Sequence, residues 1–251
     1  MTVLSNRLVP LAIILVGAIS LSQAAIAGPT WPEGPGCGPF GTGNCLLPYH
    51  AQVPDGTGQL ARITGSLDGL SEIVGTGGFA ANFEDVFLIK ITDPALFAAS
   101  TSPSSNGSAS FNSQLFLFTG PDHPDGPGLG MFANDDEAGS LAGESRITGG
   151  ATDGSSSPAF IPGLHYMLGI SGMNNVPESD GGSIFTNSLT TEISGPDGPG
   201  GGNAISGWSG SGEFGTYQIT LLGTEFATIP SPSTIALFVT GMAFGSKRRR
   251  R

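Results

Sequence analysis

Short apolar runs, separated by stretches rich in Gly, Ser, Asn, Asp and Pro, make up most of the chain between residues 28 and 228. Residues 84–91 alternate, so that Phe87, Ile89 and Ile91 fall on one face of a strand. Val86 and Leu88 make the opposite face apolar as well, which is typical of a strand inside a sheet. The pattern therefore predicts a central strand over 84–91.

Further strands are expected wherever similar runs recur. Residues 163–171 place Tyr166, Leu168 and Ile170 on one face, and residues 215–223 place Tyr217, Ile219 and Leu221 inward. The remaining expected strands cover 60–67, 97–101, 111–118, 129–133 and 145–148, with a minor one at 190–193 inside a Gly/Asn/Ser-rich insertion at 172–212.

Away from the two ends of the chain, no run has the 3.6-residue period of a helix. Short strands joined by turn-rich loops predict an all-β fold. We expect a single jelly-roll-like β-sandwich over 59–228 with long Gly/Ser/Asn-rich loops, preceded by an irregular segment at 28–58. A signal helix is expected before this body and a short membrane helix after it.

Residues 1–27 have the layout of a secretory signal peptide. Arg7 supplies the positive charge, residues 8–19 are apolar, and Ala25 and Ala27 fit the small-residue site of signal peptidase. We expect cleavage before Gly28 and export of the chain. The alternative is an uncleaved anchor, which the short apolar run disfavours.

Residues 229–251 form a second sorting signal. Pro230, Ser231 and Pro232 precede an apolar run that is followed by five basic residues, Lys247, Arg248, Arg249, Arg250 and Arg251. Residues 234–246 number 13 and span about 20 Å as a helix, against about 30 Å for a bilayer core. Flanking cations can snorkel, so a transient membrane helix with its cations in the cytoplasm is expected.

This tail resembles the PEP-CTERM sorting signal of bacterial exported proteins, with Pro230-Ser231-Pro232 where Pro-Glu-Pro is usual. The resemblance implies that an exosortase, a membrane protease-transpeptidase, processes the chain on its way to the cell envelope or the extracellular matrix. The alternative for the basic block is nucleic-acid binding, which export makes unfavourable.

The exported body is strongly acidic. Between residues 28 and 230 only Arg62, Lys90 and Arg146 are basic, whereas all 20 acidic residues lie there, which gives a net charge of −17. Such a body repels nucleic acid and anionic lipid and attracts cations. Solubility outside the cell and specific cation binding are the two explanations.

Cys37 and Cys45 are the two cysteines of the chain. In an exported protein, two cysteines with glycines between them favour a small disulfide loop. A zinc site has little support, because His50 is the nearest histidine and His123 and His165 are scattered.

The order of the body's motifs resembles the bacterial pre-peptidase C-terminal-type domain over about residues 82–223. The motifs are Asp85-Val-Phe87, Ser113-Gln-Leu-Phe-Leu-Phe118, Asn134-Asp-Asp136, Gly163-Leu-His-Tyr166 and Tyr217-Gln-Ile-Thr-Leu221. The family implies a small, non-catalytic β-sandwich that in some members binds calcium.

The acidic turn at 134–137 is the best candidate site. Clustered carboxylates and turn carbonyls supply the oxygen ligands of calcium, so Asp135 and Asp136 are the candidate ligands. Asp85 joins them if its strand neighbours the turn. The alternative is a solvated turn whose Asn and Asp side chains bond the local backbone.

No Gly-x-Ser-x-Gly motif or histidine pair indicates an enzyme. We therefore expect a non-catalytic protein that meets signal peptidase, exosortase and, outside the cell, polysaccharide. The alternative function is a secreted hydrolase or carbohydrate-binding module that uses acidic residues and Trp208.

Overall fold

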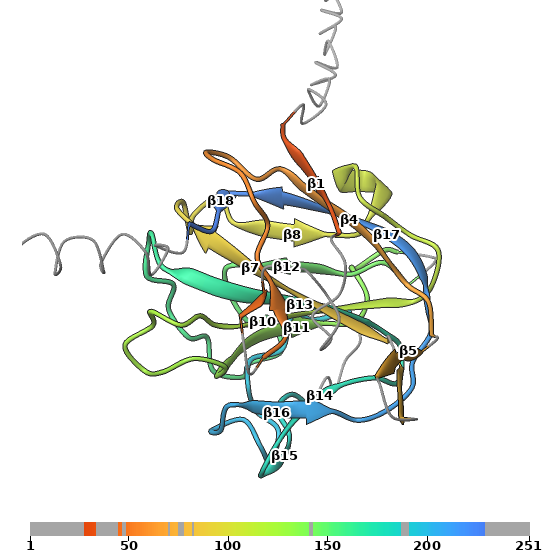
Figure 1. Cartoon of the computed structure of the whole chain (residues 1–251). Helices are drawn as coiled ribbons and strands as arrows, with labels where there is room; N and C mark the ends of the chain where they lie inside the picture. The colour runs from red at the N-terminus through yellow and green to blue at the C-terminus, as the bar shows by residue number, and fades with distance from the viewer. Residues whose placement is uncertain are drawn as a thin grey trace, which may run out of the picture.

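The structure is a computed structural model that describes residues 28–33, 45–46, 49–69, 71–74, 78–81, 83–140, 143–186 and 191–228. These residues form an all-β arrangement of several sheets, with one 3₁₀ turn, η1 (Pro103–Ser105), as the helical element of the described chain (Figure 1). Within the described residues, no helix combines the length and apolar character needed to cross a membrane.

The middle sheet carries two of the three eight-residue strands that the structure describes. Its order is β11 (Gly130–Asn134), β10 (Ser113–Thr119), β13 (His165–Gly172), β7 (Glu84–Ile91), β3 (Ala51–Gln52) and β2 (Cys45–Leu46), and β18 (Thr224–Phe226) also pairs with β7. The prediction that 84–91 is a central strand is confirmed, because β7 lies between β13 and the pair β3 and β18.

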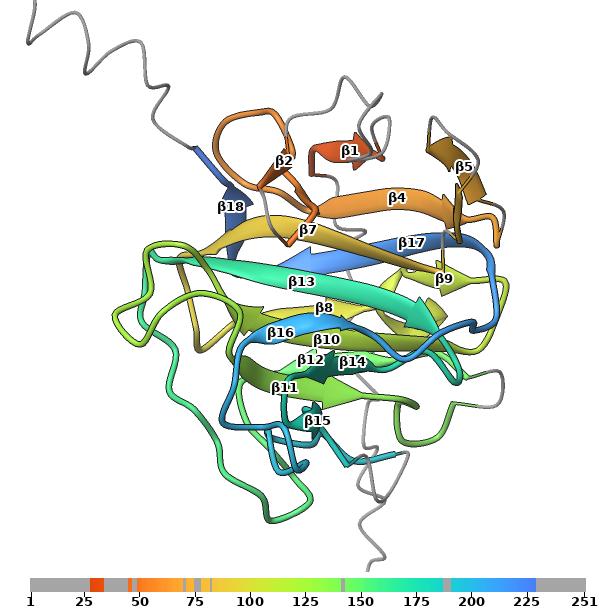
Figure 2. The same cartoon turned by 60° about the horizontal axis from the view of Figure 1, so that its bottom comes forward.

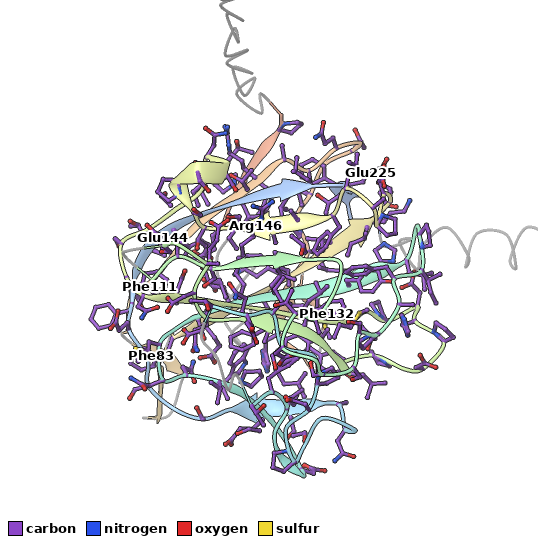
Figure 3. All side chains as sticks on the ribbon, turned by 180° about the vertical axis from the view of Figure 1, so that it is seen from behind. Phe83, Phe111, Phe132, Glu144, Arg146 and Glu225 are labelled. Carbon is purple, nitrogen blue, oxygen red and sulfur yellow. The ribbon has the colours of Figure 1, made fainter. Side chains whose placement is uncertain are left out.

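The second large sheet, which we call the front sheet, packs against one face of the middle sheet. Its order is β1 (Thr30–Pro32), β4 (Arg62–Leu67), β17 (Gly215–Leu222), β8 (Ala98–Ser100) and β12 (Arg146–Thr148), and β9 (Ser108–Ala109) also pairs with β17. The two sheets enclose the larger core, to which β7, β13 and β17 contribute the alternating residues that the sequence pattern predicted to share a face. Phe132, labelled in Figure 3, is fully buried in this core.

A small sheet covers part of the opposite face of the middle sheet. It consists of β15 (Gly182–Ser183), β14 (Pro177–Ser179) and β16 (Ile205–Trp208), and in Figure 2 it lies over β10 and β13. Between the two lies a second core, in which Ile184 and Phe185 meet Phe116 and Phe118. The middle sheet is thus apolar on both faces.

Two expectations about secondary structure need correction. The insertion at 172–212 contains the small sheet, and its residues 191–193 are not in a strand, so the predicted strand at 190–193 is wrong over the part that the structure describes. The segment at 28–58, expected to be irregular, contributes β1, β2 and β3. A hairpin of β5 (Ser71–Val74) and β6 (Gly78–Ala81) completes the described strands.

Candidate functional site

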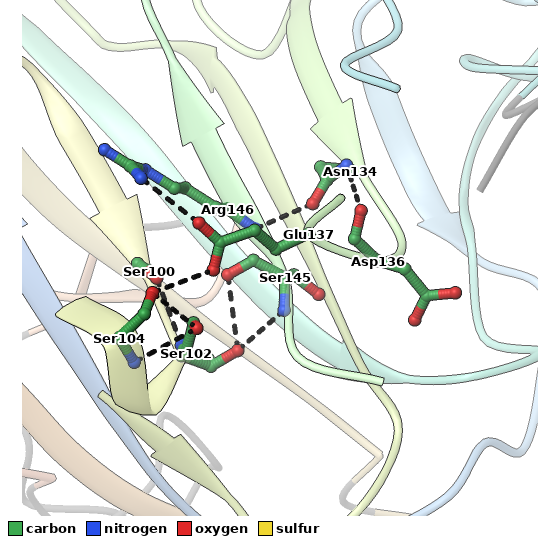
Figure 4. A network of polar contacts seen from close by, with 9 residues as sticks. Ser100, Ser102, Ser104, Asn134, Asp136, Glu137, Ser145 and Arg146 are labelled. Atoms are coloured by element: carbon green, nitrogen blue, oxygen red, sulfur yellow. Dashed lines mark hydrogen bonds and ion pairs between the residues drawn. The ribbon is translucent and has the colours of Figure 1, made fainter. Parts of the chain in front are cut away.

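The acidic turn begins where β11 ends, and Asn134 organises it. The Asn134 side-chain amide donates to the carbonyls of Asp136 (2.9 Å) and Glu192 (3.1 Å). Its oxygen accepts the Arg146 backbone N–H (2.7 Å), as Figure 4 shows. These bonds fix the turn between β11, β12 and the segment before Ser194, as the backbone-bonded alternative anticipated.

Glu137 is held by partners outside the turn. One carboxylate oxygen lies 3.1 Å from the Arg146 guanidinium, and the other accepts a hydrogen bond from the Ser104 hydroxyl at 3.4 Å (Figure 4). The Ser145 hydroxyl donates to the Asp135 carbonyl at 2.6 Å. The turn's backbone and Glu137 are therefore held by neighbouring strands.

Asp135 and Asp136 differ from the rest of the turn, because each has a buried Oδ1 that makes no hydrogen bond. The Asp135 residue is only 6% exposed. Burial, and then the nearby Asp136 carboxylate, raise the pKa of Asp135 to about 6, against a hydrogen bond from Gln114 that lowers it. The Oε1 of Gln114 is also buried without a partner.

Three side-chain oxygens therefore lack donors, on Asp135, Asp136 and Gln114. Buried polar atoms without partners are costly and call for an explanation. A hard cation such as calcium takes oxygen ligands of these types, carboxylate and amide. The three oxygens are of the kinds that calcium binds, two carboxylate and one amide.

Other polar side chains continue from Gln114 across the same end of the middle sheet. Ser171 is the cross-strand partner of both Gln114 and Glu84. Asn175 donates to the Glu84 carboxylate at 2.8 Å. Burial raises the pKa of Glu84 from 4.5 to about 7, and the Asn175 hydrogen bond opposes this shift.

The expectation that Asp85 joins the acidic turn is wrong. Its strand, β7, is separated from β11 by β13 and β10, which at about 4.8 Å per strand puts Asp85 roughly 14 Å away. Asp85 instead points into the larger core beside β17, where its carboxylate accepts hydrogen bonds from Tyr217 (2.6 Å) and Gln52 (3.3 Å).

Glu33 also lies near the Asp85 carboxylate, and no motif in the sequence pointed to it. Its Oε2 accepts a hydrogen bond from the Ser66 backbone N–H at 2.8 Å, and it lies near the Tyr217 hydroxyl that donates to Asp85. Glu33 follows a buried tryptophan in an otherwise Gly- and Pro-rich stretch, and that apolar anchor was the one signal that 30–32 is a strand.

Several predicted site residues lie outside the described residues. They are Ala25, Ala27, Cys37, Pro230, Ser231, Pro232, Lys247, Arg248, Arg249, Arg250 and Arg251. Cys45 begins β2, opposite Gln52. The disulfide, the cleavage site and the sorting motif therefore remain predictions.

The histidine and tryptophan residues have structural contacts. His165 lies on the face of β13 opposite Tyr166, as expected, and its Nδ1 is 2.8 Å from the Asp122 carboxylate. The Trp208 ring packs edge-on against Phe116 in the second core, with centroids 5.5 Å apart. Among the described residues, no three His, Cys, Asp or Glu side chains are grouped to hold a metal.

Comparison with family models, with curated proteins and with solved structures found no match for this chain. The two family resemblances therefore rest on the short motifs alone.

The raised pKa of Glu84 predicts a pH-dependent gain in stability for Glu84→Gln. The unfolded state ionises this group near 4.5 and the folded state near 7, so stability falls as pH rises through that window. Gln keeps an acceptor for Asn175 but carries no charge. In urea unfolding, the variant should gain on the order of 2 kcal/mol over the wild type between about pH 4.5 and pH 8.

The control is Asp180→Asn, which removes an exposed carboxylate. Its free energy of unfolding should differ from that of the wild type by the same amount at about pH 4.5 and at about pH 8. An equally constant difference for Glu84→Gln would contradict a buried, proton-binding Glu84.

Proposed function

We propose that this chain is an exported, non-catalytic protein of the cell envelope or the extracellular matrix, sorted by its C-terminal tail and stabilised by calcium. Its body is a jelly-roll-like sandwich between a cleaved signal helix and a short membrane helix. The observation that carries the proposal is the order of the tail: Pro230-Ser231-Pro232, an apolar run and five consecutive cations.

The charge distribution supports this proposal. The tail and the signal hold six of the nine basic residues, so the body has a net charge of −17. A membrane potential and the positive-inside rule retain the cationic end in the cytoplasm, while an acidic body stays soluble outside the cell. Signal peptidase and exosortase are the expected partners during export, with extracellular polysaccharide a further partner at the destination.

Calcium is proposed at the acidic turn. Asp135 and Asp136 would supply carboxylate oxygens and Gln114 an amide oxygen, because each has a buried oxygen that makes no hydrogen bond. The ion would compensate two adjacent carboxylates whose mutual repulsion contributes to the raised pKa of Asp135. Its role is structural, since it would tie the end of β11 to β10.

The sorting proposal predicts that the tail's cations hold the chain in the membrane until processing. Replacing Lys247, Arg248, Arg249, Arg250 and Arg251 with Gln should abolish this retention and shift the chain to an unprocessed exported form. Cell fractionation and intact-mass analysis measure both effects. Lys90→Gln, which removes a cation of the body, is the control and should leave localisation unchanged.

Wild-type localisation and wild-type tail processing in the five-residue variant would contradict the assignment.

The calcium proposal predicts that low calcium in high monovalent salt raises the melting temperature. The stabilisation should be about 2.7 kcal/mol when free calcium is about 100 times its Kd, and magnesium should do less. The shift should shrink below about pH 6, because protons compete for Asp135. Changing Asp135 and Asp136 together to Asn should remove most of it.

The matched control changes the exposed Asp125 and Asp180 to Asn, which removes the same charge elsewhere. It should keep the full calcium response. If both double variants respond to calcium like the wild type, the ion only screens the acidic body and the turn binds nothing.

A further inference from the structure

Strand β1 is a short strap at the edge of the front sheet. It pairs in parallel with β4, Trp31 opposite Ile63, and with three residues it contributes few backbone hydrogen bonds. Its main anchor is Trp31, which is 9% exposed and packs edge-on against Phe87 with ring centroids 5.8 Å apart. The Trp31 indole N–H donates to Asp55 at 2.8 Å.

Glu33, directly after this strand, turns its carboxyl group toward Asp85. The Ser66 backbone N–H donates to Glu33 Oε2 at 2.8 Å. Asp85 Oδ2 accepts from the Tyr217 hydroxyl at 2.6 Å, and Asp85 Oδ1 accepts from the Gln52 amide at 3.3 Å. Glu33 Oε2 and the Tyr217 hydroxyl both approach Gly65, so the strap, β3, β7 and β17 meet at one polar cluster.

The cluster is tightly enclosed. Asp85 is 7% exposed and Tyr217 is 3% exposed. A Cβ atom on Gly65 would lie 2.3 Å from the Tyr217 hydroxyl and 2.5 Å from Glu33 Oε2. Glu33, which is half-buried, and Tyr217 therefore converge over a position that only glycine can occupy, and water has little access to the Asp85 carboxyl group.

The two carboxyl groups lie on either side of the Tyr217 hydroxyl. Ser66 donates to Glu33, and Tyr217 and Gln52 donate to Asp85. Glu33 Oε2 and the Tyr217 hydroxyl both approach Gly65, which brings the Glu33 carboxyl group close to that of Asp85. Two ionised carboxylates this close repel each other, and a proton bound to one of them removes the repulsion. The geometry suits a carboxyl–carboxylate pair with a single negative charge.

The surrounding charges add to this demand for a proton. Burial first, and then the Glu33 carboxylate, raise the pKa of Asp85 well above its usual value, and Glu84 acts in the same direction. Burial likewise raises the pKa of Glu33, which Asp68 also raises. Burial, Asp85 and Glu33 raise the pKa of Tyr217, which keeps its hydroxyl a donor.

We propose that Glu33 and Asp85 share one proton in the folded protein, and that loss of this proton as pH rises releases strand β1 and Trp31 from the sandwich edge. Two like charges held close together, one of them on the buried Asp85, repel strongly. The strap is the element that can relieve the repulsion at least cost, because Glu33 leaves with β1, whereas Asp85 belongs to the central strand β7. The strap starts three residues after the predicted cleavage site, but the pair itself does not depend on that cleavage.

The direction of the pH dependence follows from the linkage between proton binding and folding. A carboxyl group whose pKa is raised on folding binds its proton more tightly in the folded state. The docked strap is therefore favoured at low pH, and its stability falls as pH rises above the ordinary range of a carboxyl group and through the raised values of the pair.

The experiment follows Trp31 in the full-length chain. The chain has two tryptophans, so Trp208→Phe leaves Trp31 as the sole emitter. We expect its emission to shift to longer wavelength as pH rises from about 5.5 to 9 under native conditions. In Trp31→Phe, where Trp208 reports on the second core, emission should stay constant, which separates strap release from global unfolding.

Glu33→Gln in the Trp208→Phe background tests the pair itself. The amide introduced by this substitution can accept from Ser66 and donate to Asp85 without a titrating proton, so the pH-dependent shift should disappear and Trp31 should stay docked. Asp180→Asn, which removes an exposed acid, should keep the shift. In the chain with both tryptophans, exchange of the Trp31 indole N–H gives the same readout independently of Trp208→Phe.

A Trp31 signal that does not change with pH would overturn the proposal. So would a shift that survives in Glu33→Gln.

Discussion

The middle sheet is buried on both faces, and the rest of the fold depends on covering it twice. In β7, the residues Phe87 and Ile89 belong to the core beneath the front sheet, whereas Val86 and Leu88 belong to the core beneath the small sheet. β10 and β13 have the same two-sided character, with no exposed residue in either strand. A strand of this kind exposed to water on one face would leave several large apolar side chains solvated, at about 25 cal/mol per Å².

This double cover explains why the ends of the strands hold buried acids. Acidic residues stand at the ends of the strands, with Glu84 and Asp85 at the start of β7 and Asp135 directly after β11. Asp85 and Asp135 are buried there, and Glu84 is half-buried. Burial then raises each pKa, and what differs is the compensation. Asn175 donates a hydrogen bond to Glu84. Tyr217 and Gln52 donate to Asp85. One oxygen of Asp135 receives no hydrogen bond. The proposed calcium at Asp135 and the proposed shared proton at Asp85 both offset the cost of burying a carboxylate.

The sequence predicted the long strands well because their alternation is local information. Residues 84–91 and 215–222 form strands almost as the pattern indicated, and their inward faces are confirmed. The small sheet was missed because Pro177, Gly182 and Gly207 interrupt any period, and its apolar residues make sense only against Phe116 across the second core. Strand order is also non-local, and for that reason Asp85 was assigned to the wrong carboxylate group and Glu33 was not assigned at all.

The central claim is that both covers are required, so that the middle and small sheets unfold as one cooperative unit. Native-state hydrogen exchange over a denaturant series tests this most directly. The account predicts that amides of β10 and of β16 converge on one exchange free energy, equal to that of global unfolding. Exchange of β16 through a smaller opening, with β10 still protected at the global value, would contradict it.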